Sequence, residues 1–517
     1  MKRGLGGLLG LGAICALAAC TAGDESPSTA EGEEDLTSLS ARQRTLEFEG
    51  MVYVAASSND EKILEAVHKQ TQSAFGALLA QEVGVNSREV QGVDARSFHK
   101  RNVTVVDPAG GSKEMIEVRY KYTDHAVVPV AMSRKTSLSL ALLGQGHEAK
   151  MKEVVENCTK NDKEAREDAD GGLLWYDFNP SKASCRKAME AEQRVIDNET
   201  ATLADTKKMI PKSRAERVYL PVTFSLSRSE NNATKSTYPE YDRLFSGGAE
   251  PGVLNIVLLS GRLAHDRVEA KKDDGYYHWM DALGVVFDEN PDFELKKIEP
   301  AATLPEGRNF KEAIKWVVYD QWPSGVNGTE RTALATKFAN AVDNHWLTFE
   351  KKVKVTIGNQ APKDLTIRIE TLFGADEDPK PHQRALSRGD VVIYNGHSYI
   401  GYGPLDPDNF KSTRFPGSYQ LFWFDSCVSY NYYEKDFFTL KEGGSKNLDL
   451  ITNGLEAPEW ESGAAEGKFI TKFIGGSMPS YQVLLEAAKA TDSLRVVDGE
   501  IDNRFHPDRT SVKLSKP

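Results

Sequence analysis

Two segments of the chain place a reactive side chain directly after an apolar run. In residues 390–398 (DVVIYNGHS) the run leads into His397, and in residues 419–427 (YQLFWFDSC) it leads into Cys427. A thiol attacks a carbonyl carbon efficiently only as its thiolate, which a neighbouring imidazole favours. The protonated imidazole can afterwards donate its proton to a leaving amine. The two side chains together therefore predict acyl transfer through a thioester.

The elements around these side chains indicate an α/β fold. From about residue 250, apolar runs alternate with segments of helical periodicity, which is typical of a mostly parallel sheet flanked by helices on both faces. Ligands bind beyond the carboxyl ends of such strands, so neighbouring strands would bring His397 and Cys427 together at one edge. The Gly- and Pro-rich connection at residues 401–417 would lie across this cleft. We expect strands at residues 254–259, 353–357, 365–369, 391–394, 419–424 and 448–452, and helices at 276–287, 329–346 and 480–490.

The preceding residues, 45–235, have the pattern of a smaller α+β domain. Apolar residues recur at helical spacing after a short β run, and two alternating runs are joined by a Pro- and Gly-containing turn. A long segment rich in Lys, Glu and Asp is predicted to be helical. We expect strands at residues 51–54, 103–106, 116–122 and 219–226, a helix near 63–79, and helices within 145–215. The α/β domain would then span residues 245–500, and residues 501–517 would form a polar C-terminal tail.

The first residues have the features of a bacterial export signal. Two basic residues precede an apolar stretch, residues 4–16, that is too short for a membrane-spanning anchor. Residues 17–20 (LAAC) resemble the lipobox, in which acylated Cys20 becomes the first residue of the mature chain after removal of residues 1–19. Acyl chains on Cys20 would anchor the protein to a membrane of the bacterial cell envelope. Thr21 follows where Asp would be expected for inner-membrane retention, which favours the outer membrane.

An acidic segment follows the expected lipidation site. Residues 21–40 contain six acidic and no basic side chains, together with Ser, Thr and Pro. This composition predicts a disordered tether, which we place at residues 20–44.

The cysteine count is informative because it leaves an odd number in the folded part. Of five cysteines, Cys15 leaves with the signal and Cys20 carries the lipid. In an oxidising compartment Cys158 and Cys185, which are 27 positions apart, are expected to form a disulfide. Cys427 is then either a buried inert thiol or a thiol with a chemical role.

The composition excludes two classes of protein. The chain has 517 residues and a formal net charge of −12, and its mean hydropathy is −0.47. The only long apolar run is the export signal, so a multi-span membrane protein is excluded. Nucleic acid is not an expected partner, because its recognition requires clustered Lys and Arg. The expected partners are a peptide or protein substrate and, through the N-terminal lipid only, a membrane.

The two strand ends resemble those of the caspase-like (clan CD) cysteine peptidases, the group that contains caspases, metacaspases, legumains and gingipains. The resemblance lies in an apolar strand ending in Gly-His and a later one ending in Asp-Ser-Cys, in that order, and covers roughly residues 250–500. Residues 424–427 are similar to the metacaspase motif Asp-Ser-Cys-His-Ser-Gly. The resemblance implies a caspase-like mostly parallel sheet flanked by helices, preceded here by the smaller α+β domain.

The resemblance also implies roles for individual residues. Cys427 would be the nucleophile and His397 the general acid and base. The backbone N–H groups of Ser398 and Cys427 would form the oxyanion hole. Asp425 would line a primary pocket for a Lys or Arg side chain of the substrate. No cofactor and no metal ion is implied. The chain departs from the family pattern at Ser398, where the family usually has Gly, and at residues 428–430, where the Gly of the Cys motif is absent.

Three other readings of these segments stay open. Residues 396–400 (GHSYI) nearly match the Gly-x-Ser-x-Gly elbow of α/β-hydrolases, in which Ser398 would be the nucleophile. The last Gly is replaced by Ile400, however, and the only downstream histidine is His506 in the polar tail. The caspase-like domain could instead be an inactive binding module of a surface lipoprotein. An Asp-rich loop at Asp406 and Asp408 would suit calcium, although such loops are usually solvated turns.

The N-terminal domain is also a candidate prodomain that is removed on activation. Basic residues suited to cleavage are frequent at residues 207–217, between the two domains. A protein that cleaves substrate while still full length would contradict this hypothesis.

Overall fold

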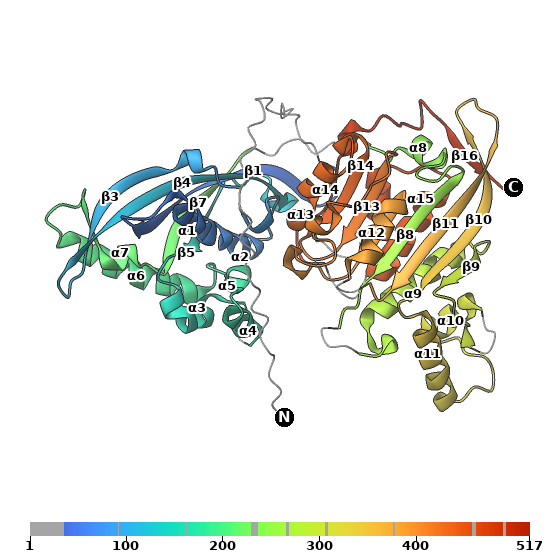
Figure 1. Cartoon of the computed structure of the whole chain (residues 1–517), viewed down its shortest axis with the longest axis horizontal. Helices are drawn as coiled ribbons and strands as arrows, with labels where there is room; N and C mark the ends of the chain where they lie inside the picture. Colours follow the sequence, from blue (N-terminus) through green and yellow to red (C-terminus); the bar gives the residue numbers. More distant parts are fainter. Residues whose placement is uncertain are drawn as a thin grey trace. The chain divides into compact units, whose positions relative to one another are not determined.

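The computed structural model of the chain describes residues 36–90, 92–160, 163–228, 236–264, 268–305, 309–375, 378–457, 462–489 and 493–517. The described residues belong to one compact unit of the chain. The predicted signal peptide, the lipidation site Cys20 and most of the predicted tether lie outside the described residues. The compact unit is mixed α/β and contains two sheets with helices packed on them (Figure 1).

The first sheet is built on a long antiparallel pair, β1 (Ala41–Ala55) and β4 (Ser112–Pro129), which stay in register along the whole of β1. The strand order is β5-β7-β1-β4-β3-β6, with β2 also paired to β4. Gly50 lets β1 pass Tyr120 closely, because a Cβ there would lie 2.2 Å from the tyrosine side chain. The other strands are β2 (Gly84–Val85), β3 (His99–Val106), β5 (Ser137–Leu143), β6 (Met209–Pro211) and β7 (Tyr219–Leu226).

The helices of this part are mostly short, and they carry the predicted disulfide. Cys158, at the end of α3, and Cys185, in α6, are bonded to each other and fully buried, so the predicted pairing is confirmed. The predicted hairpin is confirmed by the antiparallel pairing of β3 with β4. The helices are α1 (Asp60–Gln72), α2 (Ala74–Leu79), α3 (Met151–Cys158), α4 (Glu164–Asp170), α5 (Leu174–Asp177), α6 (Ala183–Ala201) and α7 (Lys212–Ala215).

The folded part begins earlier than the sequence suggested. Leu36 is buried, and Thr37 forms an antiparallel bridge with Val497. β1 then starts at Ala41, within the segment expected to be tether. The acidic composition that suggests a tether ends at Asp35, and the apolar side chains that follow are the ones that join the core.

The second sheet has the order β15-β14-β13-β12-β8-β11-β10-β16, with β9 paired to β10. The five adjacent strands β14, β13, β12, β8 and β11 run parallel to one another, and antiparallel strands complete both sides. The strands are β8 (Val253–Ser260), β9 (Glu294–Glu299), β10 (Trp346–Ile357), β11 (Lys363–Phe373), β12 (Val391–Asn395), β13 (Gln420–Asp425), β14 (Leu448–Asn453), β15 (Arg495–Asp498) and β16 (Val512–Ser515).

Both faces of the parallel strands are covered. Ile393 and Trp423 pack in one apolar cluster with α9 and α15, whereas Val392 and Phe422 pack in another with α12 and α14. Strands buried on two faces read as continuous apolar runs, which explains why the sequence located them correctly. The helices are α8 (Tyr241–Phe245), α9 (Asp274–Glu289), α10 (Phe310–Val317), α11 (Gly328–Val342), α12 (Pro379–Arg388), α13 (Ser429–Tyr432), α14 (Glu434–Leu440), α15 (Ser462–Ile474) and α16 (Tyr481–Ala487).

Two boundaries of this part differ from expectation. The helix predicted to reach residue 346 ends at Val342, because Trp346 begins β10. The polar tail contains β16, in which Val512 is buried against the sheet and pairs with Ile357 of β10. Strands on the outer side of a sheet bury few residues, so their apolar signal in the sequence is weak.

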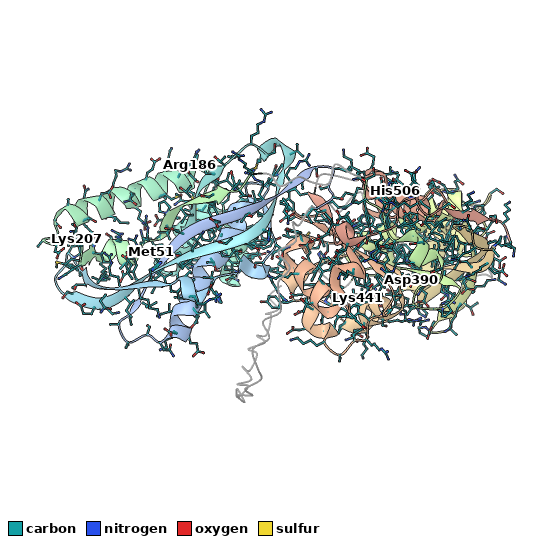
Figure 2. All side chains as sticks on the ribbon, turned by 90° about the horizontal axis from the view of Figure 1, so that it is seen from above. Met51, Arg186, Lys207, Asp390, Lys441 and His506 are labelled. Atoms are coloured by element: carbon teal, nitrogen blue, oxygen red, sulfur yellow. A yellow bond between two sulfur atoms is a disulfide. The ribbon has the colours of Figure 1, made fainter. Side chains whose placement is uncertain are left out.

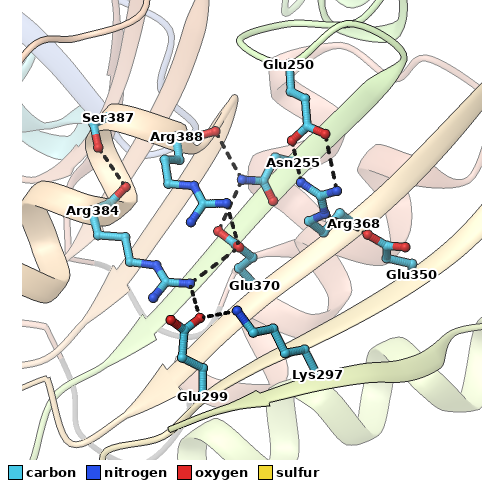
Figure 3. A network of polar contacts seen from close by, with 10 residues as sticks. All are labelled: Glu250, Asn255, Lys297, Glu299, Glu350, Arg368, Glu370, Arg384, Ser387 and Arg388. Atoms are coloured by element: carbon cyan, nitrogen blue, oxygen red, sulfur yellow. Dashed lines mark hydrogen bonds and ion pairs between the residues drawn. The ribbon is translucent and has the colours of Figure 1, made fainter.

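A network of charges fixes α12, the helix that precedes β12, on the sheet (Figure 3). Arg384 and Arg388 of α12 lie 3.7 and 3.3 Å from the buried carboxylate of Glu370 on β11. Arg384 also pairs with Glu299 of β9, and Asn255 of β8 donates to the Arg388 carbonyl. The helix that leads into β12 is therefore held by side chains of three strands, β8, β9 and β11.

Buried charges also hold the amino ends of the parallel strands. The Asp390 carboxylate accepts from the backbone N–H groups of Ala249 and Asn255, and burial raises the pKa of Asp390 to about 6. Lys441 donates to Gln420 at 2.7 Å, and burial lowers its pKa to about 8 (Figure 2 labels Asp390 and Lys441). The amino end of β12 is thus fixed, and its carboxyl end leads to the candidate site.

Candidate active site

The two strands that carry the candidate catalytic residues are immediate neighbours. β12 and β13 run parallel, and Asn395 of β12 is the register partner of Asp425 of β13. His397 and Cys427 each follow this pair by two residues. Both therefore leave the sheet at the same level of its carboxyl edge, as the sequence predicts.

The imidazole of His397 is held by a backbone carbonyl. Its Nε2 lies 3.0 Å from the carbonyl oxygen of Leu263, which follows β8, the strand on the other side of β12. A carbonyl oxygen only accepts hydrogen bonds, so we assign the ring proton to Nε2. In the neutral ring, Nδ1 is then the nitrogen that accepts a proton. The edge of the His397 ring also contacts the Tyr399 ring, with centroids 5.6 Å apart.

Tyrosine hydroxyls fix the peptide groups around His397. Tyr394 donates to the carbonyl of His397 at 3.0 Å, and Tyr433 donates to the carbonyl of Ser398 at 2.8 Å. Gly396 has no room for a side chain, because a Cβ there would lie 2.5 Å from the Tyr394 hydroxyl oxygen. The loop that presents His397 is consequently a defined structure.

Cys427 lies outside the disulfide, half-buried, at the start of a sharp turn. Its Sγ is 4.0 Å from the carbonyl oxygen of Ala457. The next residue, Val428, has a φ of 50° and is buried, and its N–H donates to the Leu455 carbonyl. A β-branched residue is rarely found in the left-handed region, and such conformations cluster at functional sites.

The strand end at His397 has the same property. Tyr399 and Ile400 have φ values of 50° and 54°. Non-glycine residues of positive φ therefore follow both candidate catalytic residues within three positions. Other described residues, such as Val90 and Leu494, also have positive φ, so this conformation accompanies the edge of the sheet without being confined to it.

Asp425 is placed differently from the expected pocket role. Its side chain is fully buried, and its Oδ1 accepts from Arg495 and from Asn453, each at 2.8 Å. Arg495 in turn lies over the ring of Trp423, with 4.6 Å between the guanidinium carbon and the ring centroid. The carboxylate expected to receive a substrate's basic side chain instead receives Arg495 of this chain.

Asp425 belongs to a buried polar row at the ends of the parallel strands. Ser260, Asn395 and Asp425 are successive register partners on β8, β12 and β13. Glu466 of α15 is also fully buried. Burial, and then the charge of Asp425, hold the pKa of Glu466 well above its usual range. Sequence reasoning missed Glu466 and Arg495, although an acid within the mostly apolar helix at residues 462–474 is a signal that could have identified the former.

The residues of the alternative readings have their own contacts. Ser398 is buried, while His506 pairs with Asp508 and contacts the ring of Tyr238. Asp406 accepts from Arg88, whereas Asp408 pairs with Lys411. In the part of the chain that the structure describes, no three His, Cys, Asp or Glu side chains gather in a way that could hold a metal ion.

None of the described helices is both long and apolar enough to cross a bilayer.

Comparison with known proteins gives no family for this chain. No protein-family profile, no curated protein and no solved structure matches it.

Proposed function

We propose that residues 245–500 form a caspase-like cysteine endopeptidase in which Cys427 is the nucleophile and His397 is the general acid and base. One observation carries the proposal: the histidine and the thiol follow register-paired residues of adjacent parallel strands, and the Leu263 carbonyl holds His397 Nε2. For a thiol without a chemical role, a position at the same sheet edge as an oriented imidazole would not be expected. The positive φ values that follow both residues add independent support.

The proposed reaction uses these two side chains, backbone N–H groups and water. The imidazole takes the thiol proton, and the thiolate attacks the carbonyl carbon of the scissile peptide bond. Backbone N–H groups of Ser398 and Cys427 stabilise the oxyanion of the tetrahedral intermediate. When the C–N bond breaks, the imidazolium protonates the leaving amine and a thioester remains. Water then attacks the thioester with His397 as base, which releases the carboxylic acid and restores the thiol.

The contacts of Asp425 argue against the expected preference for a basic side chain in the substrate. A preference for basic residues was expected from Asp425, whose carboxylate is paired with Arg495 and buried. A second positive charge at this carboxylate would require displacement of Arg495. We therefore propose that the primary pocket uses other residues of the same edge, and we assign no charge preference to it.

Peptide hydrolysis by the full chain tests the proposal. We would use peptides with Arg, Lys, Asn or Asp before the scissile bond and compare wild type with Cys427→Ala and Ser398→Ala. Hydrolysis that is lost in Cys427→Ala and retained in Ser398→Ala supports the cysteine peptidase. Hydrolysis that depends on Ser398 alone overturns it in favour of the serine hydrolase, and hydrolysis of no peptide by any form overturns it in favour of the binding module.

A further inference from the structure

The loop that holds His397 is itself held by one buried carboxylate. Asp273 is fully buried, and its side chain caps α9 by accepting from the Gly275 N–H at 2.9 Å. The same Oδ1 accepts from the Leu263 N–H at 2.9 Å, and Oδ2 accepts from the Ala264 N–H at 3.3 Å. Ordinary helix caps use the side chain only for the first turn of their own helix. Asp273 additionally ties this helix to the loop after β8.

α9 is itself fixed to the sheet, so a loop that is bonded to its N-terminus is held in place. Trp279 of α9 is fully buried, and its indole N–H donates to Thr371 of β11 at 2.6 Å. The N-terminus of α9, the Asp273 carboxylate and residues 263–264 therefore form one connected structure.

Leu263 is the point where this structure reaches the candidate site. Its N–H donates to Asp273, and its carbonyl accepts from His397 Nε2 at 3.0 Å. The loop is also joined to β12 by the Gly261 N–H, which donates to the Asn395 carbonyl at 2.7 Å. Both polar groups of Leu263 are thereby engaged, one with the scaffold and one with the imidazole.

We propose that Asp273 is a positioning residue for His397, acting through the Leu263 carbonyl. It touches neither the thiol nor a substrate. Its carboxylate fixes the direction of the carbonyl that holds the Nε2 proton, and this selects the tautomer in which Nδ1 accepts the thiol proton. The inference rests on the proposed function, because it concerns the same histidine and thiol.

A single substitution separates this role from helix capping. Asp273→Asn keeps one side-chain oxygen, and Asn caps helices as well as Asp does. With the oxygen kept at the Oδ1 position, which the Gly275 and Leu263 N–H groups share, the NH₂ group takes the Oδ2 position, where it faces the Ala264 N–H and pushes the loop away. We expect kcat to fall by about tenfold or more with KM within about twofold, because small displacements of a catalytic group are costly.

The second measurement is the pH dependence of Cys427 alkylation by iodoacetamide in the full chain, read by mass spectrometry of the Cys427 peptide. In Asp273→Asn the reaction should need higher pH than in wild type. The matched control is Asn327→Ala, which removes the cap and capping box of α11, a helix cap without a tie to the His397 loop. It should leave both the alkylation profile and kcat unchanged. If Asp273→Asn does not fold, Asp273→Ser is used in its place for both measurements, because serine retains one capping oxygen.

The outcomes distinguish a failure of the positioning role of Asp273 from a failure of the proposed function. A folded Asp273 variant with wild-type kcat and a wild-type alkylation profile overturns the positioning role and leaves the proposed function intact. Wild-type protein that hydrolyses no peptide, and whose Cys427 reacts as an ordinary thiol, overturns the proposed function and this inference with it.

Discussion

Arg495 and Asp425 form an ion pair of 2.8 Å in which the carboxylate is completely withdrawn from solvent. The ion pair joins the first residue of β15 to the last residue of β13, and Asp425 lies two residues before Cys427. Asn453 of β14 donates to the same carboxylate and lies 3.3 Å from the Ser426 carbonyl. The turn that presents the thiol is thus fixed from two other strands by largely buried side chains.

We expect Arg495→Met to destabilise the fold strongly. The substitution keeps most of the side-chain volume but leaves Asp425 buried without its counter-charge, which typically costs about 3–5 kcal/mol. Urea unfolding of the full chain measures this loss. The matched control is Lys354→Met, which removes an exposed ion pair with Asp364 and should leave the unfolding midpoint nearly unchanged. Equal midpoints for the two variants would show that Asp425 does not depend on Arg495.

Stability should fall as pH rises from about 4 to about 7 because of Asp449. Burial raises the pKa of this carboxyl to about 7, although Tyr419, Tyr481 and Asn503 donate hydrogen bonds to it. The unfolded chain has an ordinary Asp pKa near about 3.9, so the folded state binds the extra proton between the two values. The Asp449 contribution is fully present below about pH 4 and is lost as pH rises through about 7, at about 1.4 kcal/mol per pH unit.

Asp449→Asn tests this dependence because the amide does not titrate. Urea unfolding between pH 4 and pH 8 should show a flatter profile for this variant than for wild type. Asp364→Asn, at an exposed position, should keep the wild-type slope. Parallel profiles for wild type and Asp449→Asn would contradict the raised pKa.

We expect the disulfide to contribute substantially to the stability of the N-terminal part of the protein. Cys158 and Cys185 enclose a separation of 27 positions, for which chain-entropy arguments give about 3 kcal/mol. The double variant Cys158→Ala/Cys185→Ala should unfold at a lower urea concentration, and reductant should lower the wild-type midpoint to a similar extent. Cys427→Ala should retain the response to reductant. A wild-type midpoint that reductant leaves unchanged would contradict the prediction.

The sequence was most informative where burial is complete. The runs at residues 254–259, 391–394 and 448–452 are mostly apolar because helices cover both faces, and each is a parallel strand in the structure. The expected oxidising compartment and the positions of Cys158 and Cys185 predicted the disulfide, which the structure contains. That His397 and Cys427 follow neighbouring parallel strands was expected from the rule that parallel strands end at one edge. The lipid anchor at Cys20 stays a prediction, because it lies outside the described residues.

The residues that the sequence did not reveal are those whose role depends on distant partners. Arg495 is 70 positions from Asp425, and Leu263 is 134 positions from His397. The motif alone assigned Asp425 to a substrate pocket, since nothing local shows that an arginine from β15 reaches it. A backbone carbonyl such as that of Leu263 carries no residue signature at all. Positive φ at Val428 is likewise invisible, because Val is among the least expected residues for it.

The pH dependence of Cys427 alkylation in wild type and in His397→Gln tests the central claim most directly. The full chain is treated with iodoacetamide from pH 5.5 to pH 9, and modification of the Cys427 peptide is followed by mass spectrometry. If His397 stabilises the thiolate, wild-type protein reacts near pH 6 almost as fast as near pH 8.5. His397→Gln should then lose about tenfold in rate per pH unit below about 8.5, as an ordinary thiol does. Identical profiles for the two proteins would contradict the account.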